Sequence, residues 1–166
     1  MSTTADARSR VLERLDELNI TYQLYEHPAV FTAEEAAAHW SGIAGAPVKN
    51  LFLRNKKGDR HYLVILGIEK QADLRHLVGL IGDDRLSFGS PDRLMRLLGV
   101  TPGSVSPFGL INDTDRAVTV VVDSDLRSVE RLIFHPNDNT ASLTIAAGDF
   151  SRFLDQQGNR VRWMRL

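Results

Sequence analysis

Residues 50–66 read NLFLRNKKGDRHYLVIL and predict a β-hairpin. Two apolar-rich runs, residues 50–55 and 61–66, flank Lys56-Lys57-Gly58-Asp59, whose composition is typical of a turn. Farther along the chain, Ala117 to Val122 is a continuous β-branched run, as expected of a strand buried on both faces. The hairpin and this run indicate a sheet at the centre of the fold.

Local signals on either side of the hairpin predict helices and outer strands. Helices are expected at residues 4–18, from the capping-box pair Thr32 and Glu35 through 38, from the cap Asp73 to Ile81, from Ser90-Pro91 to Gly99, and at 149–156. Further strands are expected at residues 22–26, 131–135, 142–146 and 160–164. No linker or repeat divides the chain. We therefore expect one domain over residues 1–166 with an α+β fold, in which helices flank a central mixed sheet.

The composition excludes several classes of protein. Without cysteine the chain has no disulfide, no thiolate nucleophile and no cysteine-ligated zinc. Glycine-rich nucleotide motifs and the H-E-x-x-H spacing are absent, so we expect neither a cofactor nor a metal. The net charge of -1 argues against bulk attraction to nucleic acid. No run of about 18 apolar residues occurs, and Met1 to Arg10 is polar, so we expect a cytoplasmic protein that does not enter a membrane.

Lys49 interrupts an apolar strand in the stretch Ala46-Pro47-Val48-Lys49-Asn50-Leu51-Phe52-Leu53. Its stem can lie along the sheet while its ammonium reaches a cleft, where it can neutralise a phosphate or polarise an ester carbonyl. The alternative is an edge-strand lysine that discourages aggregation. Both readings stay open from the residues alone.

Residues 98–110, LGVTPGSVSPFGL, form a long connection rich in glycine and proline. Glycine lets the backbone approach a ligand, and successive N–H groups in such a turn can bind an anion. The other interpretation is a structural connection between a helix and the next strand. A serine nucleophile is not expected, because Pro107 stands where a nucleophile elbow needs its last glycine.

Residues 133–140, IFHPNDNT, place His135 at a strand end among hydrogen-bonding side chains. A histidine there can act as an acid, a base or a hydrogen-bond donor near neutral pH. The alternative is a turn whose Asn and Asp side chains satisfy their own backbone.

Several short motifs, taken in order, resemble a known family. They are Glu26-His27-Pro28, Phe31-Thr32-Ala33-Glu34-Glu35-Ala36, Lys49-Asn50-Leu51-Phe52-Leu53-Arg54, Leu86-Ser87-Phe88, Leu98-Gly99-Val100, Gly103 to Gly109, His135-Pro136 and Asn139-Thr140. Together they resemble the YbaK/ProX-type aminoacyl-tRNA deacylases, which comprise the editing domain of bacterial prolyl-tRNA synthetase and its free-standing relatives. The likeness runs from the first helix to about Phe153 and is greatest to alanyl-tRNA(Pro) deacylases.

The resemblance implies a YbaK-like fold in which the acceptor end of tRNA enters a cleft. It implies that Lys49 is the functional lysine and that Gly103 to Pro107 is the family's G-x-x-x-P loop. It also implies metal-free hydrolysis by a bound water, helped by a ribose hydroxyl of the terminal adenosine. The implied partner is aminoacylated tRNA, and prolyl-tRNA synthetase is a further candidate partner.

We hypothesise a role for each candidate residue on this basis. Lys49 would hold the terminal phosphate or ribose, and the backbone N–H groups around Gly103 and Ser104 would meet the ester carbonyl or the water. His135 would shape the pocket or hold the aminoacyl group. The residues expected to bind the substrate or to form a short apolar pocket are Phe52, Ile65, Leu66, Val105, Pro107 and Asn139.

Two alternatives remain open from the sequence. One is a deacylase for cysteinyl- or seryl-tRNA, with the same chemistry and a different pocket. The other is a nucleic-acid-binding module without catalysis, whose basic clusters would meet phosphates and whose aromatic side chains would stack on bases. Its candidate residues are Arg54, Lys56, Lys57, Arg60, Arg160, Arg162, Arg165, Trp40, Tyr62 and Trp163.

Overall fold

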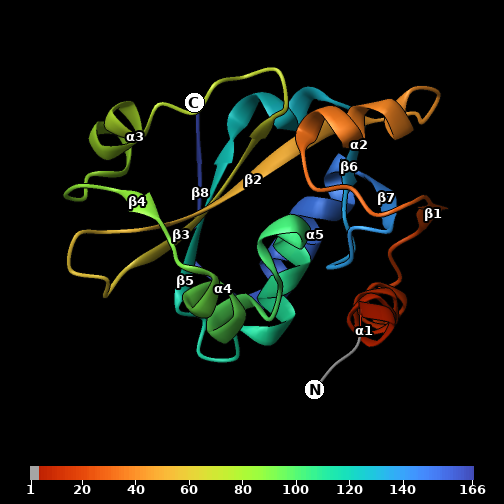
Figure 1. The fold of residues 1–166 in the computed structure, drawn as a ribbon, viewed down its shortest axis with the longest axis horizontal. Coiled ribbons are helices and arrows are strands. Elements are labelled where there is room, and N and C mark those ends of the chain that lie inside the picture. Colours follow the sequence, from red (N-terminus) through yellow and green to blue (C-terminus); the bar gives the residue numbers. More distant parts are fainter. Residues whose placement is uncertain (1–3) are drawn as a thin grey trace.

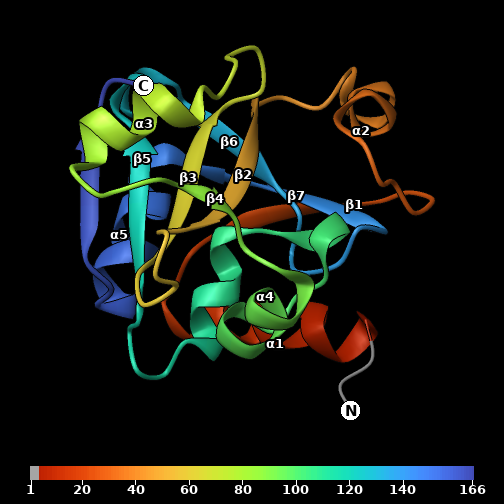
Figure 2. The ribbon, with the colours of Figure 1, turned by 60° about the vertical axis from the view of Figure 1, so that its left-hand side comes forward.

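The hairpin expected from residues 50–66 forms the middle of an eight-stranded mixed sheet. The computed structural model describes residues 4–166, so Met1 to Thr3 of the polar N-terminal stretch lie outside it. Strands follow the order β1-β7-β6-β2-β3-β5-β8, and β4 pairs with β2 away from this path (Figures 1 and 2). The bounds are β1 Tyr22–Glu26, β2 Ala46–Arg54, β3 His61–Gly67, β4 Ser87–Phe88, β5 Val118–Asp123, β6 Arg131–Phe134, β7 Ala141–Ala146 and β8 Val161–Met164.

Parallel and antiparallel pairings alternate in blocks across the sheet. β2 is antiparallel to β3 and to β4, and β7 is antiparallel to both β1 and β6. β2 is parallel to β6, and β5 is parallel to β3 and β8. The expected mixed sheet is therefore confirmed, and the central β3 is buried at every position.

Within residues 4–166, five α-helices flank the sheet. They are α1 Thr4–Glu17, α2 Ala33–Trp40, α3 Leu74–Ile81, α4 Pro91–Leu98 and α5 Ala147–Gln157, with 3-10 turns at Pro102–Ser104, Pro107–Asn112 and Ser124–Ser128. The predicted helix starts are confirmed, because Thr32, Asp73 and Ser90 each accept a hydrogen bond from a backbone N–H of the first turn. The carboxylate of Glu35 accepts its hydrogen bond from the N–H of Phe31, one residue before the cap.

Strand alternation divides the core between the two faces of β2, β3 and β5. One face carries Phe52, Leu63 and Val120, which pack with residues of α1, α4 and α5. The other face carries Leu53, Val64 and Val121, which pack with Leu77 and Ile81 of α3. Within residues 4–166, no helix is long and apolar enough to cross a membrane.

Candidate active site

A pocket lies beside a stretch of β2 that has no paired strand on one of its edges. β6 pairs with β2 only at Ala46 and Pro47, and β4 pairs with it only at Leu53 and Arg54. Between these pairings β2 is joined to β3 on its other edge. Among the described strands none pairs with the first edge there, so backbone and side chains near residues 48–51 can meet a ligand.

The pocket at this open edge has a volume of about 160 Å³. Lys49, Gly103, Val105 and His135 line it, although they come from three distant segments of the chain. The remaining lining residues are Val30, Phe31, Thr32, Ala36, Trp40, Val48, Asn50, Ile68 and Pro102. Most of the lining residues are apolar, and the polar groups among them are the ones that can orient a ligand.

Gly103 sits in a loop that is fastened to the turn after β6. The buried hydroxyl of Ser106 donates to Oδ1 of Asn137 over 2.9 Å and accepts from the N–H of Phe108. A methyl group added at Gly103 would lie 3.5 Å from Nδ2 of Asn139 and 3.5 Å from the ring of Phe31, which is ordinary contact. The glycine is therefore required less by the surrounding protein than by the space it leaves open in the pocket.

His135 follows directly after β6 and faces the pocket in one defined tautomer. Its Nδ1 lies 2.8 Å from the carbonyl oxygen of Ala141, so Nδ1 carries the proton and donates. Burial lowers the pKa of His135 below its ordinary value of 6.5, although the bond to Ala141 opposes this. At neutral pH the imidazole is therefore uncharged, and Nε2 is an acceptor.

A hydrogen-bonded chain behind His135 holds α2 against the sheet. Nε1 of Trp40 donates to Oγ of Ser142, and Nε2 of His27 lies 2.9 Å from the same oxygen. Nδ1 of His27 lies 2.9 Å from the carbonyl oxygen of Pro28, which makes Nδ1 the donor. Ser142 therefore donates to Nε2 of His27, and all three side chains are satisfied. The His135 ring lies about 6 Å from both the Trp40 and the His27 rings.

Two neighbouring polar side chains of β2 complete the site. Lys49 is half-buried, and no salt bridge to it is found in residues 4–166. Oδ1 of Asn50 is buried and has no hydrogen-bond partner among the described residues. An unsatisfied buried acceptor costs about 1–3 kcal/mol, and because Asn50 lines the pocket, a ligand there can supply the missing hydrogen bond.

The structure separates the candidate residues into three groups. Lys49, Gly103, Val105 and His135 line the pocket, and Asn139 stands beside it, donating from Nδ2 to the carbonyl oxygen of Val30 over 2.7 Å. The other candidates do not line it, because they are buried among core or loop residues: Phe52, Ile65, Leu66, Ser104 and Pro107.

Ser104 differs from the expectation in a specific way. Its backbone N–H, which we expected to face the ester carbonyl, donates to the carbonyl oxygen of Thr101 over 2.9 Å. Pro102 has no N–H, so Gly103 is the residue of this turn whose N–H remains to meet a ligand.

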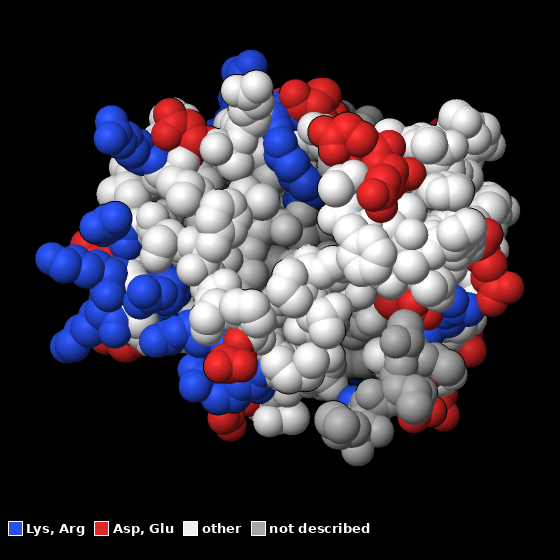
Figure 3. Space-filling view, viewed as in Figure 1, with Lys and Arg blue, Asp and Glu red and all other residues white. Residues whose placement is uncertain are grey.

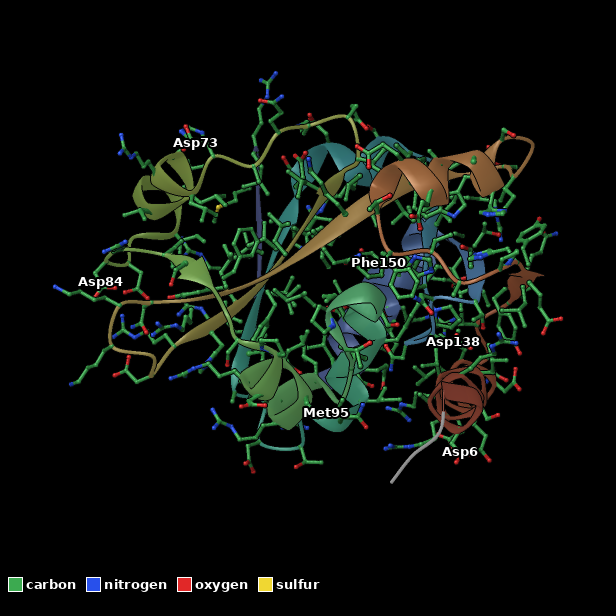
Figure 4. All side chains as sticks on the ribbon, in the orientation of Figure 1. Asp6, Asp73, Asp84, Met95, Asp138 and Phe150 are labelled. Atoms are coloured by element: carbon green, nitrogen blue, oxygen red, sulfur yellow. The ribbon has the colours of Figure 1, made fainter. Side chains whose placement is uncertain are left out.

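Sequence reasoning missed the walls supplied by residues 30–40 and the carboxamide of Asn50. The only signal for Asn50 was a second polar residue in an apolar strand, next to Lys49. The turn after β6 is also tied to α1, because Nε of Arg8 donates to Oδ2 of Asp138 over 2.8 Å. Figure 4 labels Asp138 near α1. Within the described part of the chain, no group of three His, Asp or Glu side chains could hold a metal ion.

The fold agrees with those of known structures. A structure of a proposed trans-editing enzyme for prolyl-tRNA synthetase has a TM-score of 0.68 and 22% identity, with 100% of this chain and 99% of that chain covered. The structure of hypothetical protein APE2540 has a TM-score of 0.71 and 22% identity, with 93% and 97% covered. At this identity the two structures show the fold alone, an α+β domain.

Sequence comparison gives the family. The aminoacyl-tRNA editing domain model matches residues 27–153. Prolyl-tRNA editing protein ProX of Acetoanaerobium sticklandii is 41% identical over 161 residues, with 97% of this chain and 98% of the relative covered. Prolyl-tRNA synthetase associated domain-containing protein 1 of Danio rerio is 37% identical, with 91% and 83% covered. The chain belongs to the aminoacyl-tRNA editing domain family and is an aminoacyl-tRNA deacylase.

Proposed function

We propose that this deacylase removes alanine that has been attached to tRNA(Pro) by mistake. The observation that carries the proposal is the size of the pocket, about 160 Å³. An apolar cavity of about 150 Å³ holds one benzene, and an alanyl group with its attacking water is of similar size. A prolyl group with the same water is larger. The name of the relative ProX, a prolyl-tRNA editing protein, supports tRNA(Pro) as the carrier.

The proposed reaction is attack of water on the ester carbonyl carbon. The new carbon–oxygen bond forms as the bond to the ribose oxygen breaks, and the proton from water ends on that ribose oxygen. The ammonium of Lys49 would hold the terminal phosphate or ribose and so orient the ester. The N–H of Gly103 would stabilise the developing oxyanion.

Asn50 and His135 would hold the aminoacyl end in this reaction. Oδ1 of Asn50 lacks a protein partner, and Nε2 of neutral His135 is an acceptor. Both can accept hydrogen bonds from the α-ammonium group or from the attacking water. Apolar side chains such as Val48, Val105 and Ile68 would then enclose the methyl group.

Selection by size suits an editing site. A synthetase built for proline rejects the smaller alanine poorly, because each missing methylene is worth only about 1–3 kcal/mol. A second site too small for proline can remove the error. We propose that the whole chain, residues 1–166, serves as this one editing domain in the cytoplasm. The packing of Val11 and Leu15 of α1 into the main core supports that extent.

The test is hydrolysis of a panel of tRNA(Pro) esters carrying alanine, cysteine, serine or proline. We expect the wild-type protein to hydrolyse alanyl-tRNA(Pro) rapidly and to leave prolyl-tRNA(Pro) intact. The Lys49→Ala variant should not accelerate hydrolysis of the alanyl ester over its rate in buffer. If the cysteinyl or seryl ester is hydrolysed faster than the alanyl ester, that amino acid is the substrate in place of alanine. Hydrolysis of the prolyl ester would refute the size argument. If no ester is lost faster than in buffer, the proposal fails. Addition of prolyl-tRNA synthetase to the assay, with co-purification, tests that candidate partner.

A further inference from the structure

Two exposed aromatic rings mark the open edge of β2. Phe31 is 74% exposed at the pocket, and Phe88 of β4 is 60% exposed opposite Leu53. Single exposed apolar side chains are common on protein surfaces, but exposed rings beside a nucleic-acid site can stack on bases.

Positive charge gathers just beyond Phe88. We call this group the hairpin flank; its members are Arg54, Lys56, Lys57 and Arg60 of the β2–β3 hairpin and Arg93 and Arg96 of α4. Arg93 holds the two elements together, because its Nη1 donates to the carbonyl oxygen of Gly58 over 2.9 Å. Figure 3 shows Lys and Arg side chains concentrated on the side of the molecule where the hairpin lies in Figure 1, and acidic side chains over α2.

Few direct salt bridges neutralise the hairpin flank, although Asp59 of the same turn interacts electrostatically with Lys57 and Arg60. In residues 4–166, only Arg60 of this group forms a salt bridge, with Asp83 at 3.6 Å. The backbone N–H of Lys56, not its ammonium, bonds to Asp84, which Figure 4 labels beside the hairpin. The pKa of His61 reports the same field, because burial lowers it first and the charges of Arg93, Arg96 and Arg54 lower it further.

The pocket and the hairpin flank lie at opposite ends of β2, and the side chains of Lys49 and Arg54 alternate to opposite faces of that strand. Lys49 and Arg54 are five positions apart on β2, or roughly 16 Å at about 3.3 Å per residue. Phe88 pairs with Leu53 between them, on the edge that the pocket leaves open. The net charge of the chain is -1, so this concentration is a local feature of one surface.

We infer that Phe88 and the hairpin flank form the docking surface for the RNA strand that leads away from the aminoacylated 3′ end. This inference rests on the proposed function, which puts that end in the pocket. The cations would meet successive phosphates and Phe88 would stack on an unpaired base. Phosphate contacts position an RNA without reading its sequence, so the surface sets where the 3′ end enters and leaves the choice of amino acid to the pocket.

The test measures binding of uncharged tRNA(Pro), which needs no hydrolysis. Lys57→Glu is compared with Arg10→Glu, an identical charge change on an exposed residue of α1. We expect Lys57→Glu to weaken binding at least roughly fivefold near 0.1 M salt, and to lower the slope of log K against log salt by about 0.9. Arg10→Glu should change affinity less than twofold. Equal losses in the two variants would overturn the inference, because net charge alone would then explain them.

RNA length gives a second discrimination. The loss of kcat/KM caused by Lys57→Glu or Phe88→Ala should be at least about fivefold larger on aminoacylated tRNA than on a short 3′-terminal aminoacyl fragment. The fragment cannot reach the hairpin flank. Equal losses on both substrates would overturn the inference. If wild-type protein binds tRNA through the flank but hydrolyses no ester, docking stands and the proposed function fails.

Discussion

Asn50 and Asn55 lie five residues apart on one stretch of chain and have opposite environments. Oδ1 of Asn55 accepts the N–H groups of Gly58, Asp59 and Arg60, and its Nδ2 donates to Asp59. Oδ1 of Asn50 is also buried and has no partner among the described residues. The turn end of the hairpin uses its asparagine to complete the fold, whereas the pocket end leaves its asparagine unsatisfied. The same side chain thus marks structure in one place and ligand binding in the other.

The largest effect is expected at Lys49, next to the unsatisfied asparagine. Lys49→Ala should reduce kcat/KM for alanyl-tRNA(Pro) by about a hundredfold or more, since an ester displaced by about 1 Å reacts roughly that much more slowly. The free energy of unfolding should change little, because no described residue forms a salt bridge with Lys49. Steady-state kinetics and urea unfolding of the same preparation check both statements. A variant that keeps near-normal kcat/KM would remove Lys49 from the mechanism.

Asn55→Ala should act on stability. It removes an acceptor of three backbone N–H groups at a residue that is 3% exposed, so we expect a loss of about 2 kcal/mol in the free energy of unfolding. Urea denaturation measures this directly. A loss below about 0.5 kcal/mol, the usual range for surface changes, would show that water replaces the side chain fully.

Asn50→Ala should show the reverse pattern. Removing an unsatisfied buried acceptor relieves a desolvation cost, so we expect the free energy of unfolding to stay within about 0.5 kcal/mol or to rise. We expect kcat/KM for alanyl-tRNA(Pro) to fall about tenfold, as for loss of one hydrogen bond to the substrate. If Asn50→Ala instead destabilises the protein as much as Asn55→Ala, the comparison between the two asparagines is wrong.

The smallest effect is a pH dependence set by His135. Its folded-state pKa is lowered by burial, so the folded protein resists protonation there. Stability should be constant above the ordinary histidine pKa of 6.5, fall as the pH drops below it, and level off beneath the folded-state pKa. Activity of the folded protein should fall a few-fold at lower pH still, as the pH passes through the folded-state pKa and Nε2 gains a proton. The pKa of His61 is also lowered, so the His135→Gln variant is needed to assign the effect. The fall of activity at acidic pH should be absent from the pH profile of that variant.

Local signals in the sequence predicted most of the fold. The hairpin, the caps at Thr32, Asp73 and Ser90, and the glycine that ends α4 depend on residues within a few positions of one another. β4 was not predicted as a strand, because two residues carry no periodicity and become a strand only by pairing with β2. The 3-10 turns of residues 102–112 were likewise hidden inside an expected irregular connection.

The candidate site was predicted less completely than the fold. Lys49, Gly103 and His135 could be singled out because their residue types are unusual for their segments. Phe52 and Ile65 were placed in the pocket wall, but both face the main core. Alternation along a strand tells which residues share a face, and it does not tell which edge of β2 remains unpaired. That edge depends on where β6 and β4 stop, which is a property of the whole sheet.

The indole of Trp40 gives the pocket a built-in optical signal. The chain has two tryptophans, and only Trp40 lines the pocket, with its N–H fixed by Ser142. Trp163 lies on β8 with the guanidinium of Arg127 4.2 Å from its ring centre. In a Trp163→Phe background the tryptophan fluorescence of the protein would come from the pocket alone. Emission from that single indole would follow entry and departure of the aminoacyl end in real time, without a label on the RNA.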